Sequence, residues 1–262
     1  MDLKLRGRSV LITGATRGIG RGIAEVMAAE GCDLHISART MDSLEAVARE
    51  LRGRHGVTVA CHAHEMNIPE EVEKLGHSCR DVDVLINNAG DIPTGRLTEI
   101  DSAAWRRGWE SKVFGYIDLT RIILPQMYKR RSGNVVNVIG VAAEVPNPAY
   151  IAGCMGNAAL NMFTHVLGGE AVEYGVRVNA VNPGPTMSDR HKSHLIERAV
   201  QRFGDADRWP EIMKDYPSGR SGSVEEVASL VAFLASDLSS NISGASVRVD
   251  GGIWAAARKK RS

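Results

Sequence analysis

The sequence has few of the features that mark membrane, secreted or nucleic-acid-binding proteins. It contains no long apolar run and no recognisable signal peptide, and its 262 residues carry a formal net charge of only +1. A nearly balanced charge provides no overall field that would draw the protein to nucleic acid or to a membrane surface. These absences predict a cytoplasmic protein with neither nucleic acid nor a membrane as a partner.

Cysteine and recognisable histidine motifs are scarce as well. The sequence has no CxxC pair, and its eight histidines, which include His62 and His64, form no HExxH-type motif. We therefore expect no metal site. Since no disulfide framework is apparent, we expect free thiols in a reducing compartment at the four cysteines, Cys32, Cys61, Cys79 and Cys154.

Short apolar runs alternate with longer amphipathic segments, which is typical of βαβ units. The expected strands are Ser9–Thr13, Asp33–Ser37, Val57–His62, Val82–Asn87, Asn134–Ile139, Val176–Val181 and Ser246–Val249. The expected helices are Gly18–Glu30, Met41–Arg54, Pro69–Cys79, Ala103–Arg130, Gly156–Tyr174 and Val224–Ala235. Right-handed crossovers between them predict an α/β fold, with a Rossmann-type doubly wound parallel sheet of about seven strands in a single domain.

A glycine-rich turn follows the first expected strand. Gly14, Gly18 and Gly20 lie between the apolar run Val10–Thr13 and the first expected helix. Glycine lets backbone amides approach a pyrophosphate closely, and a helix N-terminus adds positive potential there. The turn therefore predicts a dinucleotide site.

Four segments resemble the short-chain dehydrogenase/reductase family. They are Thr13–Gly20, which matches TGxxxGxG, Asn87–Gly90, which matches NNAG, and the C-terminal stretches Asn182–Pro185 and Val249–Gly252. Because they span nearly the whole chain, the sequence is identified as a divergent member of this family. The resemblance implies a nucleotide-binding domain at residues 1–255, which includes a substrate lid at about 186–220, followed by a basic tail at 256–262.

The resemblance also implies which residues hold the cofactor. The glycine turn would contribute Gly14, Thr16, Arg17, Gly18, Ile19 and Gly20. The adenine would lie against Glu65 and Met66, and its ribose against Asn88, Ala89 and Gly90. The nicotinamide half would meet a segment that contains Pro183, Gly184, Thr186 and Ser188.

The residues after the second strand distinguish the two nicotinamide cofactors. NAD-specific sites usually place an acidic residue there to bind the ribose 2′-hydroxyl. This chain has Arg39 at that point and no acid, and Arg17 lies inside the glycine turn. Two guanidinium groups suit a 2′-phosphate, so we predict that NADP(H) is preferred over NAD(H). The alternative is that Arg39 only stacks on the adenine.

The usual catalytic residues of the family are missing. The family uses a Tyr that transfers the proton, a Lys four residues later that lowers the pKa of this phenol, a Ser that orients the carbonyl, and an Asn on an earlier helix. Matching the flanking segments places at these four positions, in the same order, Gly153, Asn157, Gly140 and Lys112. The family's proton transfer is therefore not available in its ordinary form.

Two features indicate rearrangement rather than simple loss. The Lys and Asn positions are exchanged, because Lys112 provides the ammonium and Asn157 the amide. Six residues separate Tyr150 from Asn157, which resembles the Tyr-x6-Lys spacing of the enoyl-reductase branch of the superfamily. Tyr150, Lys112 and Asn157 are therefore the candidate catalytic residues. The alternatives are that Tyr150 packs at a loop end, and that Lys112 is solvated or pairs with Glu110 or Asp118.

Three functions fit these observations. The first is an NADP(H)-dependent oxidoreductase that acts on a carbonyl, alcohol or enone through a non-standard centre. The second is a catalytically inactive nucleotide-binding sensor or partner subunit. The third is a non-redox enzyme that uses Glu144 or Cys154, although Cys154 is also typical of a small buried apolar residue.

The resemblance further implies a small-molecule substrate and self-association. The lid is rich in cationic residues, which suits an acidic substrate but also an amphipathic helix with a solvent-exposed face. These residues are Arg190, His191, Lys192, His194, Arg198, Arg202 and Arg208. Relatives form tetramers through the helices that correspond to 103–130 and 156–174. A homotetramer or homodimer would use an apolar face, equally suited to an internal core, that contains Ala158, Ala159, Phe163, Val166 and Leu167.

Overall fold

The computed structural model describes residues 2–259, and its centre is a parallel sheet of seven strands in the order β3-β2-β1-β4-β5-β6-β7. The strands are β1 (Ser9–Thr13), β2 (Asp33–Ala38), β3 (Val59–Ala63), β4 (Val84–Asn87), β5 (Gly133–Val138), β6 (Val176–Pro183) and β7 (Ser246–Val249). The predicted Rossmann-type sheet is confirmed. The longest displacement of a strand boundary from its expected position is two residues, as at the start of β3.

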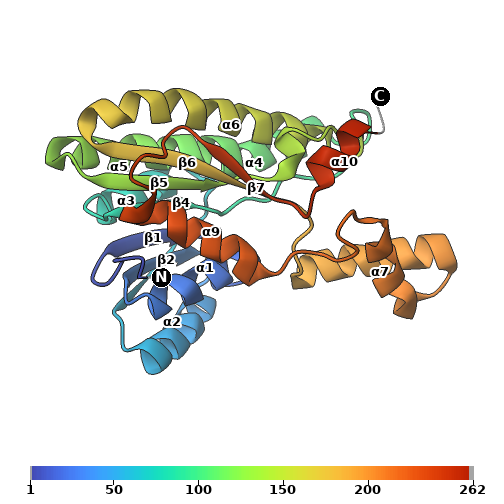
Figure 1. Cartoon of the computed structure of the whole chain (residues 1–262), viewed down its shortest axis with the longest axis horizontal. Coiled ribbons are helices and arrows are strands. Elements are labelled where there is room, and N and C mark those ends of the chain that lie inside the picture. Colours follow the sequence, from blue (N-terminus) through green and yellow to red (C-terminus); the bar gives the residue numbers. More distant parts are fainter. Residues whose placement is uncertain (1, 260–262) are drawn as a thin grey trace.

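Helices cover both faces of the sheet (Figure 1). One layer contains α1 (Gly18–Ala29), α2 (Met41–His55) and α9 (Val224–Ala235), and the other contains α3 (Pro69–Ser78), α5 (Gly115–Arg130) and α6 (Ile151–Ala171). Successive strand residues point to opposite layers, so Val10 and Ile12 belong to the first core and Leu11 to the second. Burial on both faces explains why the strands are continuous apolar runs in the sequence.

The two predicted nucleotide-binding segments meet where the direction of winding changes. β1 lies between β2 and β4, and the chain crosses to one face after β1 and to the other face after β4. Open α/β sheets bind ligands at this switch point, beyond the carboxyl ends of the strands. The glycine turn follows β1. The segment Asn87–Gly90 begins with the last residue of β4 and continues beyond it, so both segments lie at the crevice.

The predicted lid is a helical arm that extends from the body of the molecule (Figure 1). It contains α7 (Asp189–Phe203) and α8 (Trp209–Ile212). The two helices pack around a small apolar core of Leu195, Ala199 and Ile212. This core explains the apolar residues in a segment that is otherwise rich in cations.

Two expected helices differ from the structure. The helix expected at 103–130 is divided into α4 (Ser102–Trp109), a π-helical turn (Glu110–Phe114) and α5. A π-turn inserts one residue into a helix, and a hydrophobic pattern does not reveal such an insertion. The helix expected at 156–174 begins earlier, as α6 at Ile151, because tertiary packing accommodates two glycines of low helix propensity, Gly153 and Gly156.

The C-terminal part of the structure is also helical. α10 (Ile253–Lys259) includes the first residues of the expected basic tail, whereas 260–262 lie outside the described residues. Among residues 2–259, none of the helices has the length and apolar composition needed to cross a membrane.

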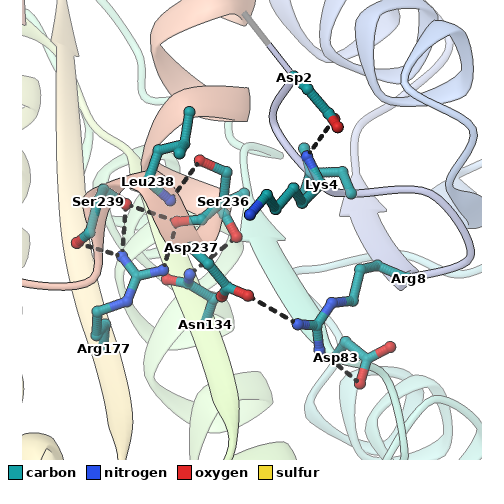
Figure 2. A network of polar contacts seen from close by, with 12 residues as sticks. Asp2, Lys4, Arg8, Asp83, Asn134, Arg177, Ser236, Asp237, Leu238 and Ser239 are labelled. Atoms are coloured by element: carbon teal, nitrogen blue, oxygen red, sulfur yellow. Dashed lines mark hydrogen bonds and ion pairs between the residues drawn. The ribbon is translucent and has the colours of Figure 1, made fainter.

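A partly buried arginine joins the sheet to the C-terminal end of α9 (Figure 2). Arg177 on β6 donates to the backbone oxygens of Leu234 (3.0 Å) and Ser236 (2.8 Å), and to the backbone oxygen and hydroxyl of Ser239 (3.0 and 2.6 Å). Asn134 on β5 donates to the Ala235 oxygen at 3.0 Å. The last carbonyls of a helix have no partner within the helix, so these side chains supply the missing donors.

This network predicts a large effect of Arg177 on stability. Arg177→Met removes four hydrogen bonds that converge on this helix end, and we expect the free energy of unfolding to fall by about 3 kcal/mol in urea denaturation. The control is Arg121→Met, because Arg121 is exposed and pairs only with Asp118 at 3.3 Å. We expect a change of at most about 0.5 kcal/mol there. Equal effects of the two substitutions would contradict the assigned role of Arg177.

Candidate functional site

The turn after β1 requires glycine and is fixed to the segment after β4. Gly14 and Gly18 have positive φ angles of 68° and 54°, and a Cβ at Gly20 would lie 2.1 Å from the Gly14 oxygen. The Asn88 amide donates to the backbone oxygens of Thr13 (2.9 Å) and Gly14 (3.3 Å). The turn therefore presents bare backbone at the crevice, with Thr16 and Ile19 between its glycines.

Positive groups surround this turn. Arg17 is the N-cap residue of α1 and makes no side-chain cap hydrogen bond, so the first amides of the helix keep their capacity to bind an anion. The Ser37 oxygen on β2 accepts from the amides of Gly14 (2.8 Å) and Ala15 (3.1 Å), which places the end of β2 beside the turn. Arg39 follows β2 and is exposed, as is Arg17. Within residues 2–259, neither arginine has an ion-pair partner.

The other residues that are predicted to contact the nucleotide differ in their exposure and in their own contacts. Glu65 is exposed, whereas the Met66 side chain is buried in the core with Leu75. Ala89 donates its amide to the Thr13 hydroxyl at 3.0 Å, and Gly90 packs directly against the side chain of Lys112.

The segment after β6 returns to the glycine turn. Pro183 is buried at the end of β6, and a Cβ at Gly184 would lie 2.8 Å from the Cα of Asp250. Thr186 donates its hydroxyl to the Gly184 oxygen at 3.0 Å. Ser188 caps α7 by accepting from the His191 amide at 3.2 Å, and its Cβ would lie 3.7 Å from a Cβ at Gly18. The predicted cofactor residues from both halves of the chain therefore lie around one crevice.

The Tyr150 ring fills the space above residue 153. A Cβ built at Gly153 would lie 2.0 Å from Cζ of Tyr150 and 2.2 Å from its Cε1. Tyr150 is the N-cap residue of α6, one turn before Gly153 on the same helix. A tyrosine at 153 would need the volume that the ring of Tyr150 occupies, so glycine at 153 is a condition for this arrangement.

At Gly140, as at Gly153, a side chain from another position lies beside the bare backbone. Asn157 is 2% exposed, and its Nδ2 would lie 3.1 Å from a Cβ at Gly140. Gly140 has a φ of 142°, a conformation that L side chains rarely adopt. Among the described residues the Asn157 Oδ1 has no hydrogen-bond partner. The amide therefore lies beside the family's serine position, with a buried acceptor that has no partner among the described residues.

Lys112 has a buried ammonium. It lies in the π-turn, packs its methylene groups on Gly90 and donates from Nζ to the Ile139 oxygen at 2.7 Å. Burial, reinforced by the charge of Arg190, lowers the pKa of Lys112 to about 8. Among the described residues Lys112 forms an ion pair with neither Glu110 nor Asp118, and Asp118 pairs with Arg121 at 3.3 Å. Lys112 is partly buried and not fully solvated.

The cation that acts on the phenol comes from the lid instead. Burial raises the pKa of Tyr150, and the positive charge of Arg190 opposes this effect most strongly. Arg190 in the first turn of α7 pairs with Asp91 at 2.8 Å, and Asp91 directly follows the Asn87–Gly90 segment. In the sequence Arg190 is one of several cations in the lid, and only the position of Asp91 directly after Asn87–Gly90 indicates this ion pair.

Glu144 and Cys154, the candidate residues for non-redox chemistry, form other contacts in the structure. Glu144 accepts from Nε of Arg248 at 3.0 and 3.1 Å and from the Asn182 amide at 3.2 Å. The Cys154 thiol accepts from the Asn147 amide at 3.4 Å and so holds a loop. Both contacts favour structural roles.

Most cations of the lid have partners within the arm. Arg198 and Arg202 share Asp215 at 3.8 and 2.7 Å, and Arg208 pairs with Glu211 at 2.6 Å. The charge of the lid is therefore largely balanced internally, which weakens the argument for an acidic substrate.

Comparison with known proteins finds matches along the whole chain. The family model described as enoyl-(acyl carrier protein) reductase matches residues 14–254. The 3-oxoacyl-(acyl-carrier-protein) reductase of Aquifex aeolicus (strain VF5) is 33% identical over 260 residues, which cover 97% of this chain and 100% of the relative.

Solved structures give the same result. The L-sorbose reductase of Gluconobacter frateurii, in complex with NADPH and L-sorbose, is 31% identical with a TM-score of 0.91, covering 97% of this chain and 99% of that one. YwfH, an NADPH-dependent reductase involved in bacilysin biosynthesis, is 28% identical with a TM-score of 0.86, covering 94% and 98%.

The buried ammonium predicts an effect on stability. The folded pKa of Lys112, about 8, lies below the ordinary value of 10.5, so at neutral pH the charged form is disfavoured by folding. This penalty fades as the pH rises from 8 to 10.5, and it corresponds to at most about 3 kcal/mol. Lys112→Met removes it but leaves the Ile139 oxygen unpaired, at a cost of about 1–3 kcal/mol.

We therefore expect Lys112→Met at pH 7 to leave the free energy of unfolding unchanged or to raise it by up to about 2 kcal/mol. Lys74→Met on the exposed side of α3 is the matched control and should stay within about 0.5 kcal/mol. A loss of more than about 2 kcal/mol in Lys112→Met alone would show that the ammonium stabilises the fold.

Proposed function

Because the chain belongs to the short-chain dehydrogenase/reductase family, we propose that it is an NADP(H)-dependent oxidoreductase with a relocated proton donor. In this proposal the substrate is a small carbonyl compound or enone, or the corresponding alcohol in the reverse direction. Tyr150 transfers the proton. The observation that carries the proposal is the ring of Tyr150 in the space above Gly153, the position at which the family has its tyrosine.

The residues around the crevice fit a dinucleotide with a 2′-phosphate. The bare backbone from Gly14 to Gly20 and the uncapped N-terminus of α1 would hold the pyrophosphate. Arg17 and Arg39, exposed and without ion-pair partners among residues 2–259, would hold the 2′-phosphate. The NADPH in the L-sorbose reductase structure supports this assignment. The bound cofactor would supply the hydride.

The environment of Tyr150 acts on its phenol in two opposing ways. Burial raises the pKa of the phenol, which keeps it protonated but makes it a weaker acid, whereas the charge of Arg190 lowers this pKa. As the substrate oxygen gains electron density, the phenolic O–H bond breaks and the proton moves to that oxygen. The charge of Arg190 stabilises the resulting phenolate, and Asp91 holds Arg190 over the crevice. This arrangement suits reduction better than oxidation.

Lys112 and Asn157 have positioning roles in this proposal. Lys112 ties the π-turn to the end of β5 beneath Gly90 and brings a positive charge to the floor of the crevice. Asn157 offers its unpartnered Oδ1 to a hydroxyl group of the bound molecules.

The phenol is tested by removing its hydroxyl alone. For Tyr150→Phe we expect kcat for the best substrate from a panel of aldehydes, ketones and enones to fall by about 10²–10⁴-fold. The Kd for NADPH should stay within about twofold, because the ring that shapes the crevice remains. Tyr174→Phe is the control, since Tyr174 stacks on Tyr128 outside the crevice, and it should keep full activity.

Gly153→Ala tests the same assignment without touching the phenol. Its methyl group would lie 2.0 Å from the Tyr150 ring, so the ring must move and kcat should again fall. Full activity in both Tyr150→Phe and Gly153→Ala would refute the relocated donor. If the unmodified chain binds NADPH tightly but turns over no compound of the panel, a nucleotide-binding sensor is favoured. If product forms without a change in nicotinamide absorbance, a non-redox enzyme is favoured.

The cofactor preference depends on the two unpaired arginines. For the double variant Arg17→Ala/Arg39→Ala we expect the Kd for NADPH to rise about 100-fold and that for NADH to change less than about threefold. Arg49→Ala on the exposed side of α2 is the control and should leave both constants unchanged. Equal weakening of NADPH and NADH would mean that the arginines do not recognise the 2′-phosphate. Fluorescence titration measures both constants.

Self-association and location complete the proposal. Met162 and Val166 on α6 are 61% and 65% exposed. They border a hollow of about 400 Å³, and a second hollow of about 650 Å³ lies along α4 and the π-turn. We propose that a second copy of the chain covers these surfaces in a homodimer or homotetramer. The four free cysteines fit the cytoplasm.

A further inference from the structure

Three side chains that bind metals meet on one face of the sheet. His35 lies on β2 and pairs in register with Ala60, two residues before His62 on β3, so both imidazoles point to the same face. Cys79 follows α3, the helix that covers this face. The Nδ1 of His35 lies 3.0 Å from Nε2 of His62, and the Cys79 Sγ lies 3.6 and 3.5 Å from these two nitrogens.

These distances match the edges of a tetrahedral metal site. With metal–nitrogen bonds of about 2.0–2.1 Å and a metal–sulfur bond of about 2.3 Å, tetrahedral angles separate two nitrogens by about 3.3 Å and nitrogen from sulfur by about 3.6 Å. The nitrogens of His35 and His62 are 3.0 Å apart, so the two imidazoles need to part by about 0.3 Å and turn these nitrogens toward a common centre. A single ion then fits all three ligands.

We propose that His35, His62 and Cys79 bind one divalent transition-metal ion, with zinc as the preferred metal and solvent at the fourth position. Two imidazoles and one thiolate form a borderline-soft donor set, which favours Zn²⁺ over Mg²⁺ or Ca²⁺. On binding, a metal–sulfur bond forms, the S–H bond of Cys79 breaks, and its proton passes to solvent.

The surroundings of the cluster support this assignment. Both imidazoles are partly exposed, so an ion can reach them from solvent, whereas Cys79 is buried. Ser37 pairs in register with His62, and its buried hydroxyl has no hydrogen-bond partner among the described residues. This hydroxyl can bond to a ligand in the fourth position.

The position of the cluster indicates what the ion does. β3 is an edge strand and pairs only with β2, and Cys79 lies where the chain leaves α3. An ion bound by all three elements would hold the edge strand and the helix end to the sheet. The proposal involves none of the residues assigned to proton transfer, so it does not depend on the proposed reaction.

Cobalt(II) is the probe for this site, because a cobalt–thiolate bond has a near-ultraviolet charge-transfer band. We expect the full chain, kept reduced and titrated without oxygen, to develop this band until about one Co²⁺ per chain is bound. Zn²⁺ should abolish the band by displacement, since it lies above Co²⁺ in affinity for such donors. Zn²⁺ should also raise the midpoint of thermal unfolding.

Matched variants identify the ligands. Cys79→Ser should abolish the band, and His62→Gln should weaken Co²⁺ binding at least about tenfold. Cys61→Ser is the control, because Cys61 precedes His62 on β3 but packs against the opposite core. It should retain both the band and the thermal shift. NADPH binding and circular dichroism confirm that each variant folds.

Two results would overturn the proposal. One is the absence of a saturable band in the unmodified chain, which would leave the cluster as a hydrogen-bonded pair of imidazoles beside a thiol. The other is an equal band in Cys79→Ser, which would assign the cobalt to another thiol such as the partly exposed Cys154. If Cys79→Ser does not fold, unchanged affinity in His62→Gln is the refuting result.

Discussion

A side chain at residue 153 and the ring of Tyr150 cannot occupy the same space, and the arrangement of the whole centre depends on this exclusion. With glycine at 153, the ring lies where a Cβ would come within 2.0 Å of its Cζ. The amide of Asn157 lies beside Gly140 in the same way, at 3.1 Å from a Cβ position. The bare backbone at 153 and 140 is thus matched by side chains from other positions. Random loss of catalytic residues would leave space at these points, whereas here the space is filled.

The electrostatics of the centre differ from the family pattern because its two cations come from different elements. Lys112 is held beneath the crevice by the Ile139 oxygen, where burial lowers its pKa to about 8. Arg190 comes from the lid, and its charge acts on the phenol of Tyr150. The arm has an apolar core of its own, and its Arg190 pairs with Asp91, which follows the Asn87–Gly90 segment. In the proposed mechanism, part of the charge that acts on Tyr150 therefore comes from the lid.

The sequence predicted the elements whose patterns are local. Strand positions followed from apolar runs buried on both faces, and the nucleotide crevice followed from glycines between a strand and a helix. It also located Gly153, Asn157, Gly140 and Lys112, because each has a fixed offset from a segment that matches the family pattern. The contacts of these residues could not be predicted in this way. The π-turn that carries Lys112 has no periodic signal, and the charge that opposes the rise in the pKa of Tyr150 comes from Arg190, 40 residues further along the chain.

The His35, His62 and Cys79 cluster shows the same limit and its physical cause. Sequence rules for metal sites recognise ligands that lie close together on one turn or helix. Here the ligands are 27 and 17 residues apart, and parallel pairing of β2 with β3 brings them together. β2 is paired on both sides, so an ion at His35 has little freedom to displace Arg39 beyond the end of the strand. β3 is paired on one side only and has the most to gain from a further link. A bound ion would therefore act mainly on the stability of the sheet edge, and the nucleotide crevice would keep its geometry with or without the metal.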